Sequence, residues 1–156
     1  MRGFVLAAAT IALPLAAAAV GQEMDQPRWM ANMARHQKVI MRGVPAPYSA
    51  TRDRTPDTPA KLRQGRALFD RNCASCHGWS GQEAGPEGFF LVPAPADLAW
   101  LARTPKDKGD PYIYWSIAEG GQPVDSEMPA FKNSLTRREI WSVAAYLRAG
   151  MPNSSP

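Results

Sequence analysis

The stretch RNCASCHG, residues 71–78, contains both cysteines of the chain and one of its two histidines. Cys73 and Cys76 are separated by two residues, and His77 follows directly. A disulfide is the simplest structural use of such a pair. However, a bridge between these two cysteines closes a very small loop and removes little entropy from the unfolded chain. Stability is therefore a weak reason for the pair, and its chemistry has to be considered.

Helix signals lie on both sides of the motif. Thr58 is a good N-cap, and it is followed by proline at the first helical position. Thr136 and Glu139 have the spacing of a capping box, which starts a last helix that ends at Gly150. No strand signal is as clear, so the sequence predicts an all-α fold. The segments expected to be helical are 26–42, 59–72, 96–103, 110–119 and 137–149.

The N-terminal part of the 156-residue chain predicts export. Residues 3–21 are uncharged, follow Arg2 and end in small residues, as a secretory signal peptide does. An uncleaved anchor is the alternative, because the apolar run is near the lower length limit for spanning a bilayer. With 1–21 as the signal, we expect a helix and a proline-rich strap over 22–57, one folded domain over 58–150 and a tail over 151–156. The folded part is expected outside the cytoplasm, which in a bacterium is the periplasm.

In an exported chain, C-x-x-C-H after a helix is the attachment signature of c-type haem. Thioether bonds from Cys73 and Cys76 would tie the porphyrin to the backbone, and His77 would be the proximal ligand of the iron. A zinc site normally needs four protein ligands, and the other histidine, His36, has no second cysteine pair beside it. A thioredoxin-like redox pair needs a preceding strand, and none is predicted. The motif therefore predicts one covalently bound haem c.

Residues around the motif make it more specific. They are Gly65, Phe69, CASCHG at 73–78, MPAF at 128–131 and IWSVAAYLR at 140–148. With these residues the chain resembles the class I c-type cytochromes over 58–150. The resemblance implies a cytochrome c fold, with three to five short helices around one covalently bound haem, here preceded by an N-terminal helical arm. It also implies that the first and last helices cross closely at Gly65 and Tyr146. A glycine inside a helix costs about 1 kcal/mol relative to alanine, so it suggests that a neighbour needs the space.

The second axial ligand is open on the residues alone. Met128 is followed by proline, which favours an extended conformation in a loop. Other candidates are His36, Met151, which lies past the final helix, and the methionines at 24, 30, 33 and 41. A methionine at helical spacing, such as Met30 or Met33, is more often packing than a ligand. The family places its ligand in the same Met-Pro context, so the resemblance points to Met128 and to a low-spin haem with His/Met ligation.

The resemblance also suggests a wall for the haem site. The family uses a proline carbonyl to orient the proximal imidazole, and Pro93 or Pro95 is the expected source here. Trp100, Trp115 and Ile117 are expected to line the apolar pocket, although aromatic residues at these positions are equally well explained as core.

Charge is unevenly distributed along the chain. The formal net charge is +4, but residues 28–71 carry +7 and residues 78–128 carry −5. Such runs are usually solvated surface, and the alternative is a bipolar molecule that its field steers toward a partner. The basic residues have no interleaved aromatic residues at a stacking site, so nucleic acid is not an expected partner.

These features together predict a periplasmic monohaem cytochrome that carries single electrons between redox proteins such as an oxidase, a reductase or a dehydrogenase, and that is not itself an enzyme. Membrane contact is expected only if the N-terminal segment is uncleaved. One alternative is a haem enzyme or sensor with an open iron site, which would leave MPAF without a role. Another is a haem subunit of a larger oxidoreductase complex, with 22–57 as the contact arm. Copper binding by His36 and the nearby methionines is a weaker hypothesis.

Overall fold

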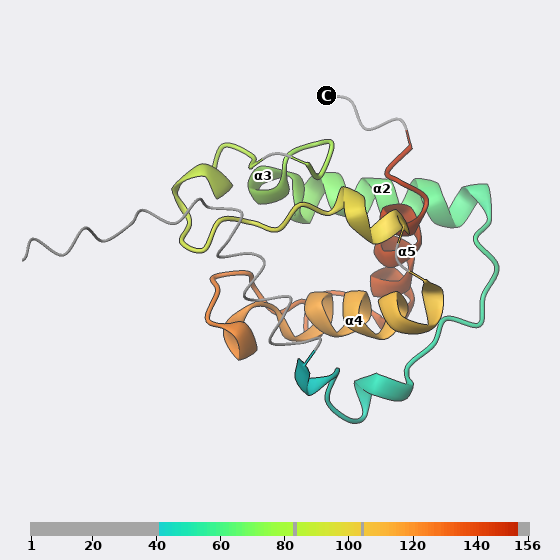
Figure 1. Ribbon diagram of the computed structural model, residues 1–156. Coiled ribbons are helices and arrows are strands. Elements are labelled where there is room, and N and C mark those ends of the chain that lie inside the picture. Colours follow the sequence, from blue (N-terminus) through green and yellow to red (C-terminus); the bar gives the residue numbers. More distant parts are fainter. Residues whose placement is uncertain (1–40, 83, 104, 153–156) are drawn as a thin grey trace, which may run out of the picture.

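The computed structural model describes residues 41–82, 84–103 and 105–152. The regular elements among these residues are all helices, and none is a strand (Figure 1). The predicted signal segment, His36 and all but the last two residues of the predicted 26–42 helix lie outside these residues. No helix in the described part is long and apolar enough to cross a bilayer. The elements are η1 (Tyr48–Ala50), α2 (Pro59–Asn72), α3 (Ala74–His77), η2 (Gly88–Phe90), η3 (Ala99–Arg103), α4 (Lys106–Glu119), η4 (Gln122–Val124) and α5 (Arg137–Arg148).

The ends of α2 and α5 confirm the cap predictions. The Thr58 hydroxyl accepts a hydrogen bond from the backbone N–H of Lys61 at 3.2 Å, with proline at the start of α2. At α5 the N–H of Glu139 donates to the Thr136 hydroxyl at 3.3 Å, and the N–H of Thr136 donates to the Glu139 carboxylate at 2.8 Å. These bonds satisfy donors that the first turn of a helix otherwise leaves unpaired.

Helices α2 and α5 cross at Gly65, as the resemblance implied. A Cβ atom at Gly65 would lie 2.0 Å from the carbonyl oxygen of Ser142 and 2.8 Å from the Cβ of Tyr146. The rings of Phe69 and Tyr146 pack together beside the crossing, with 5.8 Å between their centroids. Glycine is therefore required because the backbone of α5 occupies the space of a side chain.

Helix α4 begins earlier than predicted. The prediction started this helix at Asp110-Pro111, but the N-cap is Pro105 and the helix starts at Lys106, with Pro111 inside it. The first turn is already closed before the proline, because the N–H of Gly109 donates to the carbonyl of Pro105 at 2.8 Å. Proline at position 111 removes one later hydrogen-bond donor, and the rest of the helix tolerates that loss.

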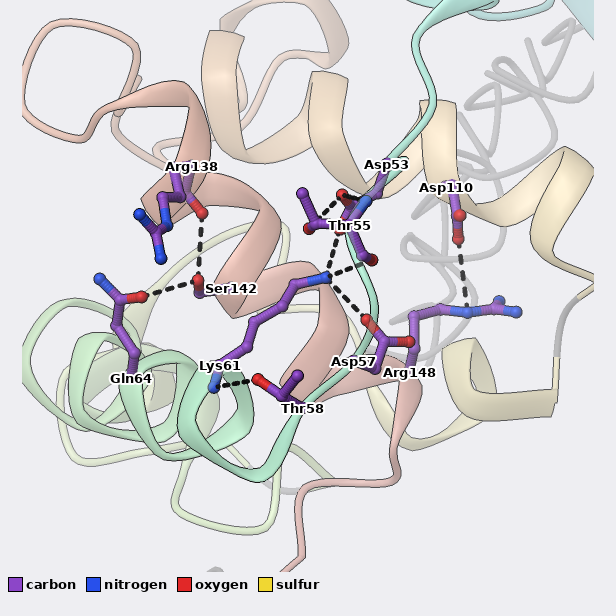
Figure 2. A network of polar contacts seen from close by, with 10 residues as sticks. All are labelled: Asp53, Thr55, Asp57, Thr58, Lys61, Gln64, Asp110, Arg138, Ser142 and Arg148. Carbon is purple, nitrogen blue, oxygen red and sulfur yellow. Dashed lines mark hydrogen bonds and ion pairs between the residues drawn. The ribbon is translucent and has the colours of Figure 1, made fainter.

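The strap, residues 43–57, is tied to α2 by ion pairs (Figure 2). The ammonium of Lys61 donates to the carboxylates of Asp53 and Asp57, and its distance to Asp57 is 2.7 Å. Burial alone would raise the pKa of Asp53, but the hydrogen bonds from Lys61 and Thr55 lower it below its usual value. The strap is thus held to α2 by the ammonium group of Lys61, whose side chain is largely buried.

The strap also contacts the far end of α4. The Tyr48 hydroxyl donates to the carboxylate of Glu119, and the rings of Tyr48 and Tyr114 lie 6.1 Å apart. Glu119 also pairs with Lys132 at 2.7 Å, beyond the loop that follows α4. The hydrogen bond to Glu119 and burial raise the pKa of Tyr48 to about 12. The strap therefore reaches both α2 and α4.

Met151, which the sequence analysis assigned to the tail, packs in the core. Its residue surface is 3% exposed, and its N–H donates to the carbonyl of Tyr146 at 3.0 Å. A Cβ atom at Gly81 would lie 2.6 Å from the Met151 sulfur. This methionine closes the end of α5 against the loop that follows α3.

Candidate functional site

The C-x-x-C-H motif folds as one short helical turn directly after α2. The N–H groups of Cys76 and His77 both donate to the carbonyl of Cys73, at 3.1 and 2.9 Å. Residues three and four positions apart in a helix lie on the same side, so this turn presents both sulfurs and the imidazole together. Gly78 ends the turn with φ +68°, which a residue with a side chain rarely adopts. No disulfide joins the two cysteines.

The imidazole of His77 is oriented by a backbone carbonyl. Its Nδ1 atom lies 3.2 Å from the carbonyl oxygen of Ala96. A carbonyl only accepts hydrogen bonds, so this contact requires the proton on Nδ1 and leaves the lone pair on Nε2. The prediction gave this role to Pro93 or Pro95. In the structure this bond is made by the carbonyl of Ala96, the residue that follows Pro95.

An apolar cavity lies on one side of the motif. It is bordered by the motif, by the end of α2, by η3, by α4 and by the inner face of α5. Two of the predicted wall residues, Trp100 and Ile117, line it. Its lining residues are Phe69, Cys73, His77, Ala96, Leu98, Trp100, Leu101, Tyr112, Ile113, Ser116, Ile117, Met128, Val143 and Leu147.

A second cavity, of about 230 Å³, adjoins the first. Cys73, His77 and Met128 line both cavities, so the two form one cleft with these residues between them. Pro93 and Pro95 line the second cavity, as predicted for the pocket. The lining residues of the second cavity are Asn72, Cys73, Ser75, Cys76, His77, Glu87, Leu91, Pro93, Ala94, Pro95, Ser126, Glu127, Met128, Pro129 and Phe131.

Met128 is held at the cleft by the backbone after α4. Its carbonyl accepts a hydrogen bond from the N–H of Gly121 at 2.8 Å. A Cβ atom at Gly120 would lie 2.5 Å from that same carbonyl, and Gly120 has φ +69°. Further along, the N–H of Phe131 donates to the carbonyl of Ile117 at 3.0 Å. The half-buried methionine is therefore positioned by a loop that is bonded to α4 at several points.

Trp115 does not line either cavity. It lies in a separate buried cluster with Val124, because it is two residues from both Ile113 and Ile117 and thus about 200° around the helix from each. The residues of α4 that face the cleft with those isoleucines are Tyr112 and Ser116. The prediction missed both, although their spacing of four along a helix is a usable signal once the helix start is known.

The chemistry of the lining residues fits a large apolar group attached through sulfur. Burial raises the pKa of the Cys73 thiol to about 12, and the neighbouring Cys76 adds to the shift. A sulfur in this place is therefore better neutral than charged, as it is in a thioether. The hydroxyl of Ser116 is shielded from solvent and has no hydrogen-bond partner in the described structure, which leaves a buried polar atom to be satisfied. A haem, with apolar faces and polar substituents, suits such a site.

A zinc site does not fit the same residues. Within the described part of the chain, no three side chains of His, Cys, Asp or Glu are grouped so that they could hold a metal ion. Met151, an alternative ligand in the sequence analysis, lines neither cavity. The alternatives His36 and the methionines at 24, 30 and 33 lie outside the described residues.

The domain matches a known protein family and is similar to a curated protein. A family model described as "Cytochrome C oxidase, cbb3-type, subunit III" matches residues 60–147. The chain is also 39% identical over 90 residues to the protein named cbb3-type cytochrome c oxidase subunit FixP of Sinorhizobium medicae (strain WSM419). That match covers 53% of this chain and 28% of the relative, so the chain spans about a quarter of that protein's length. No solved structure is significantly similar.

Proposed function

We propose that this chain is an electron-transferring haem subunit of an oxidase complex. The chain belongs to the family described as cytochrome c oxidase, cbb3-type, subunit III, and is thus a c-type cytochrome. What carries this proposal is the arrangement at the cleft: two cysteines, one histidine and one methionine border it from two sides, and all but Cys76 also face its apolar cavity. The family match then favours the subunit of a complex over the freely diffusing carrier.

Different residues would attach the haem, bind its iron and orient the iron ligand. Cys73 and Cys76 would attach the haem through thioethers, and His77 and Met128 would be its axial ligands. When bound, haem supplies a one-electron iron centre whose potential depends on its axial ligands and on burial. The carbonyl of Ala96 keeps the proton of His77 on Nδ1, so that Nε2 is the nitrogen able to bind a metal. Ser116 would donate a hydrogen bond to a polar substituent of the haem.

The apolar walls have a separate role. Because the first cavity is lined almost wholly by aliphatic and aromatic side chains, a haem bound there would have an apolar wall beside His77 and Met128 that holds little water. A thioether ligand and a dry site both favour the less charged, reduced state of iron, so we expect a relatively high potential. With both axial positions taken by protein atoms, the domain would transfer electrons and would not bind a substrate at the metal.

We propose that the domain works on the exported side of the membrane, the periplasm in a bacterium, with a single haem. Residues 3–21 predict export, and the sequence contains one C-x-x-C-H motif. The oxidase is the proposed partner because of the family to which the chain belongs.

Spectra of the matured protein test the haem site. After expression in a host that matures c-type cytochromes, the intact mass should include one haem, and the reduced protein should have a sharp α-band. Met128→Ala should abolish the weak absorption at the red end of the oxidised spectrum and allow carbon monoxide to bind. Met151→Leu is the matched control, because it changes a buried methionine outside the cleft and should leave both properties unaltered. A colourless protein, or a spectrum insensitive to Met128→Ala, would contradict the assignment.

The subunit proposal needs a separate experiment. The tagged full chain, produced in its own host and extracted in mild detergent, should migrate on a native gel with the haem-stained band that has cytochrome oxidase activity. Migration as a free protein of its own mass, with the same spectrum, would favour the diffusing carrier and overturn the subunit proposal without affecting the haem site.

A further inference from the structure

An exposed aromatic patch lies at η2. Phe89, Phe90 and Val92 have 59, 79 and 80% of their surface exposed, and the rings of Phe89 and Phe90 meet edge to face with 5.4 Å between centroids. We call these three residues the η2 patch. Exposed single apolar residues are common, but a cluster of large ones on a small domain usually marks a surface that contacts something else.

The η2 patch is fixed against the haem-attachment turn. The N–H of Gly85 donates to the carbonyl of Cys76 at 2.9 Å, and the N–H of Glu87 donates to the carbonyl of Ser75 at 3.0 Å. A Cβ atom at Gly88 would lie 2.0 Å from the carbonyl oxygen of Cys76, so glycine is needed for this approach. Figure 1 shows the yellow-green η2 segment beside α3. The patch therefore lies next to the Cys76 side of the cleft.

The surroundings of the patch are acidic. Glu87 and Glu127 are both exposed and line the second cavity, and no lysine or arginine is among the described residues that line it. The Glu87 carboxylate is 3.8 Å from the Cys76 sulfur.

Positive charge gathers elsewhere on the domain. An open groove between the strap and the start of α5 is lined by Arg52, Arg54, Arg137 and Arg138, and it shares no lining residue with the cleft. The arginine groove and the two glutamates beside the cleft therefore lie on separate surfaces of the fold. The acidic surface is the one that carries the exposed aromatic residues and adjoins the cleft.

We propose that the η2 patch is the docking surface for a protein redox partner whose own face is apolar at its centre and bears lysine or arginine around it. This inference rests on the proposed function and adds the kind of partner and the place of contact. One electron leaves the reduced domain and is accepted by a one-electron centre of the partner, or moves in the reverse direction, and no bond forms or breaks. Opposite charges speed the encounter, and the aromatic residues exclude water at the contact.

Two other occupants fit the patch less well. An anionic lipid surface would be repelled by Glu87 and Glu127. A second copy of this chain could place its arginine groove on the acidic rim, but that groove has no exposed aromatic residue to match the phenylalanines. Charge and apolar character together favour a basic protein with an apolar centre.

Stopped-flow oxidation of the reduced holoprotein tests the surface with two reagents of opposite charge. Tris(phenanthroline)cobalt(III) is cationic with aromatic ligands, and ferricyanide is anionic. At low salt, the double variant Glu87→Gln/Glu127→Gln should slow the reaction with the cobalt complex about fivefold and speed that with ferricyanide. Both effects should shrink at high salt. Phe89→Ser/Phe90→Ser should slow the cobalt reaction about threefold at any salt concentration, because it removes aromatic contact.

Control variants and the wild-type spectrum separate the possible failures. Arg52→Gln/Arg138→Gln, at the arginine groove, should leave the cobalt rate within a factor of two. Equal effects from this control and from the glutamate variant, or none from either acidic or aromatic variant, would overturn the docking surface. Self-association in sedimentation experiments that the η2 variants abolish would also overturn it, in favour of a second copy. If the wild-type protein lacks the haem spectrum, the proposed function fails first.

Discussion

Replacing Gly65 with alanine tests the helix crossing on which the cleft depends. The new Cβ atom would lie 2.0 Å from the Ser142 carbonyl oxygen, whereas ordinary contact begins at 3.4 Å. To relieve this overlap α2 and α5 must move apart, which would break the 3.1 Å hydrogen bond from the Ser142 hydroxyl to Gln64. It would also loosen the packing of Phe69 on Tyr146, whose ring centroids are 5.8 Å apart.

The size of the effect follows from two opposing contributions. Alanine is a better helix former than glycine by about 1 kcal/mol, so propensity alone predicts a more stable protein. Overpacking of a close backbone contact costs about 3 kcal/mol, and the lost hydrogen bond adds about 1 kcal/mol. We therefore expect Gly65→Ala to lower the free energy of unfolding by about 3 kcal/mol, which for a domain of this size lowers the melting temperature by roughly 15 °C.

Thermal and guanidinium unfolding of the holoprotein, followed by circular dichroism, measures this change. Ala67 is exposed on the same helix, and Ala67→Gly serves as the control, since it changes propensity alone and should cost about 1 kcal/mol. A Gly65→Ala protein that melts at or above the wild-type temperature would refute the crossing as described, because propensity would then be the stronger contribution.

Three further predictions concern the strap. Lys61→Met leaves Asp53 without its ion-pair partner, so it should lower the free energy of unfolding by about 2 kcal/mol and make the strap more sensitive to proteolysis. The control Arg63→Gln, on the exposed face of α2, should change neither property. Because the pKa of Asp53 is lowered on folding, its contribution is present above the unfolded value near 4 and should be lost as the pH falls. Acid titration of stability should show a smaller loss for Lys61→Met than for wild type, because only the hydrogen bonds from Thr55 then lower this pKa. The pKa of Tyr48 is raised to about 12, so its contribution is present below pH 10 and should be lost as the pH rises from 10 toward 12. Tyr48→Phe should remove that alkaline loss and cost about 1 kcal/mol at neutral pH through the hydrogen bond to Glu119.

Features fixed by a few neighbouring residues were predictable from the sequence. Thr58 and the Thr136–Glu139 pair are hydrogen-bonding groups at set distances from the turn that they cap, so local chemistry determines those helix starts. Gly65 was predictable for another reason: a glycine in a helix is unfavourable unless a neighbour needs its space. The helix-start predictions need only residues within about one turn of the cap. The prediction for Gly65 also needs the family resemblance.

Features that depend on where the backbone runs were harder to predict. The start of α4 was placed too late because Pro111 resembles a first helical residue, and the pairing of Gly109 with Pro105 has no sequence signature. With the helix start misplaced, the face that lines the cleft was not evident, and Trp115 was assigned to it. The carbonyl that orients His77 depends in the same way on the path of the loop, and a shift of one residue moved it to Ala96.

The strap connects the two parts of the fold that bear the proposed axial ligands. His77 follows α2, whereas Met128 lies in the loop bonded to the end of α4. The strap binds α2 through Lys61 and α4 through Glu119, which also pairs with Lys132 beyond that loop. The family match begins at residue 60, after the strap, so these contacts come from a segment outside the match. Since both sides of the cleft are joined by the strap as well as by the core, we expect the separation of the two proposed ligands to depend on residues that the shared family pattern does not include.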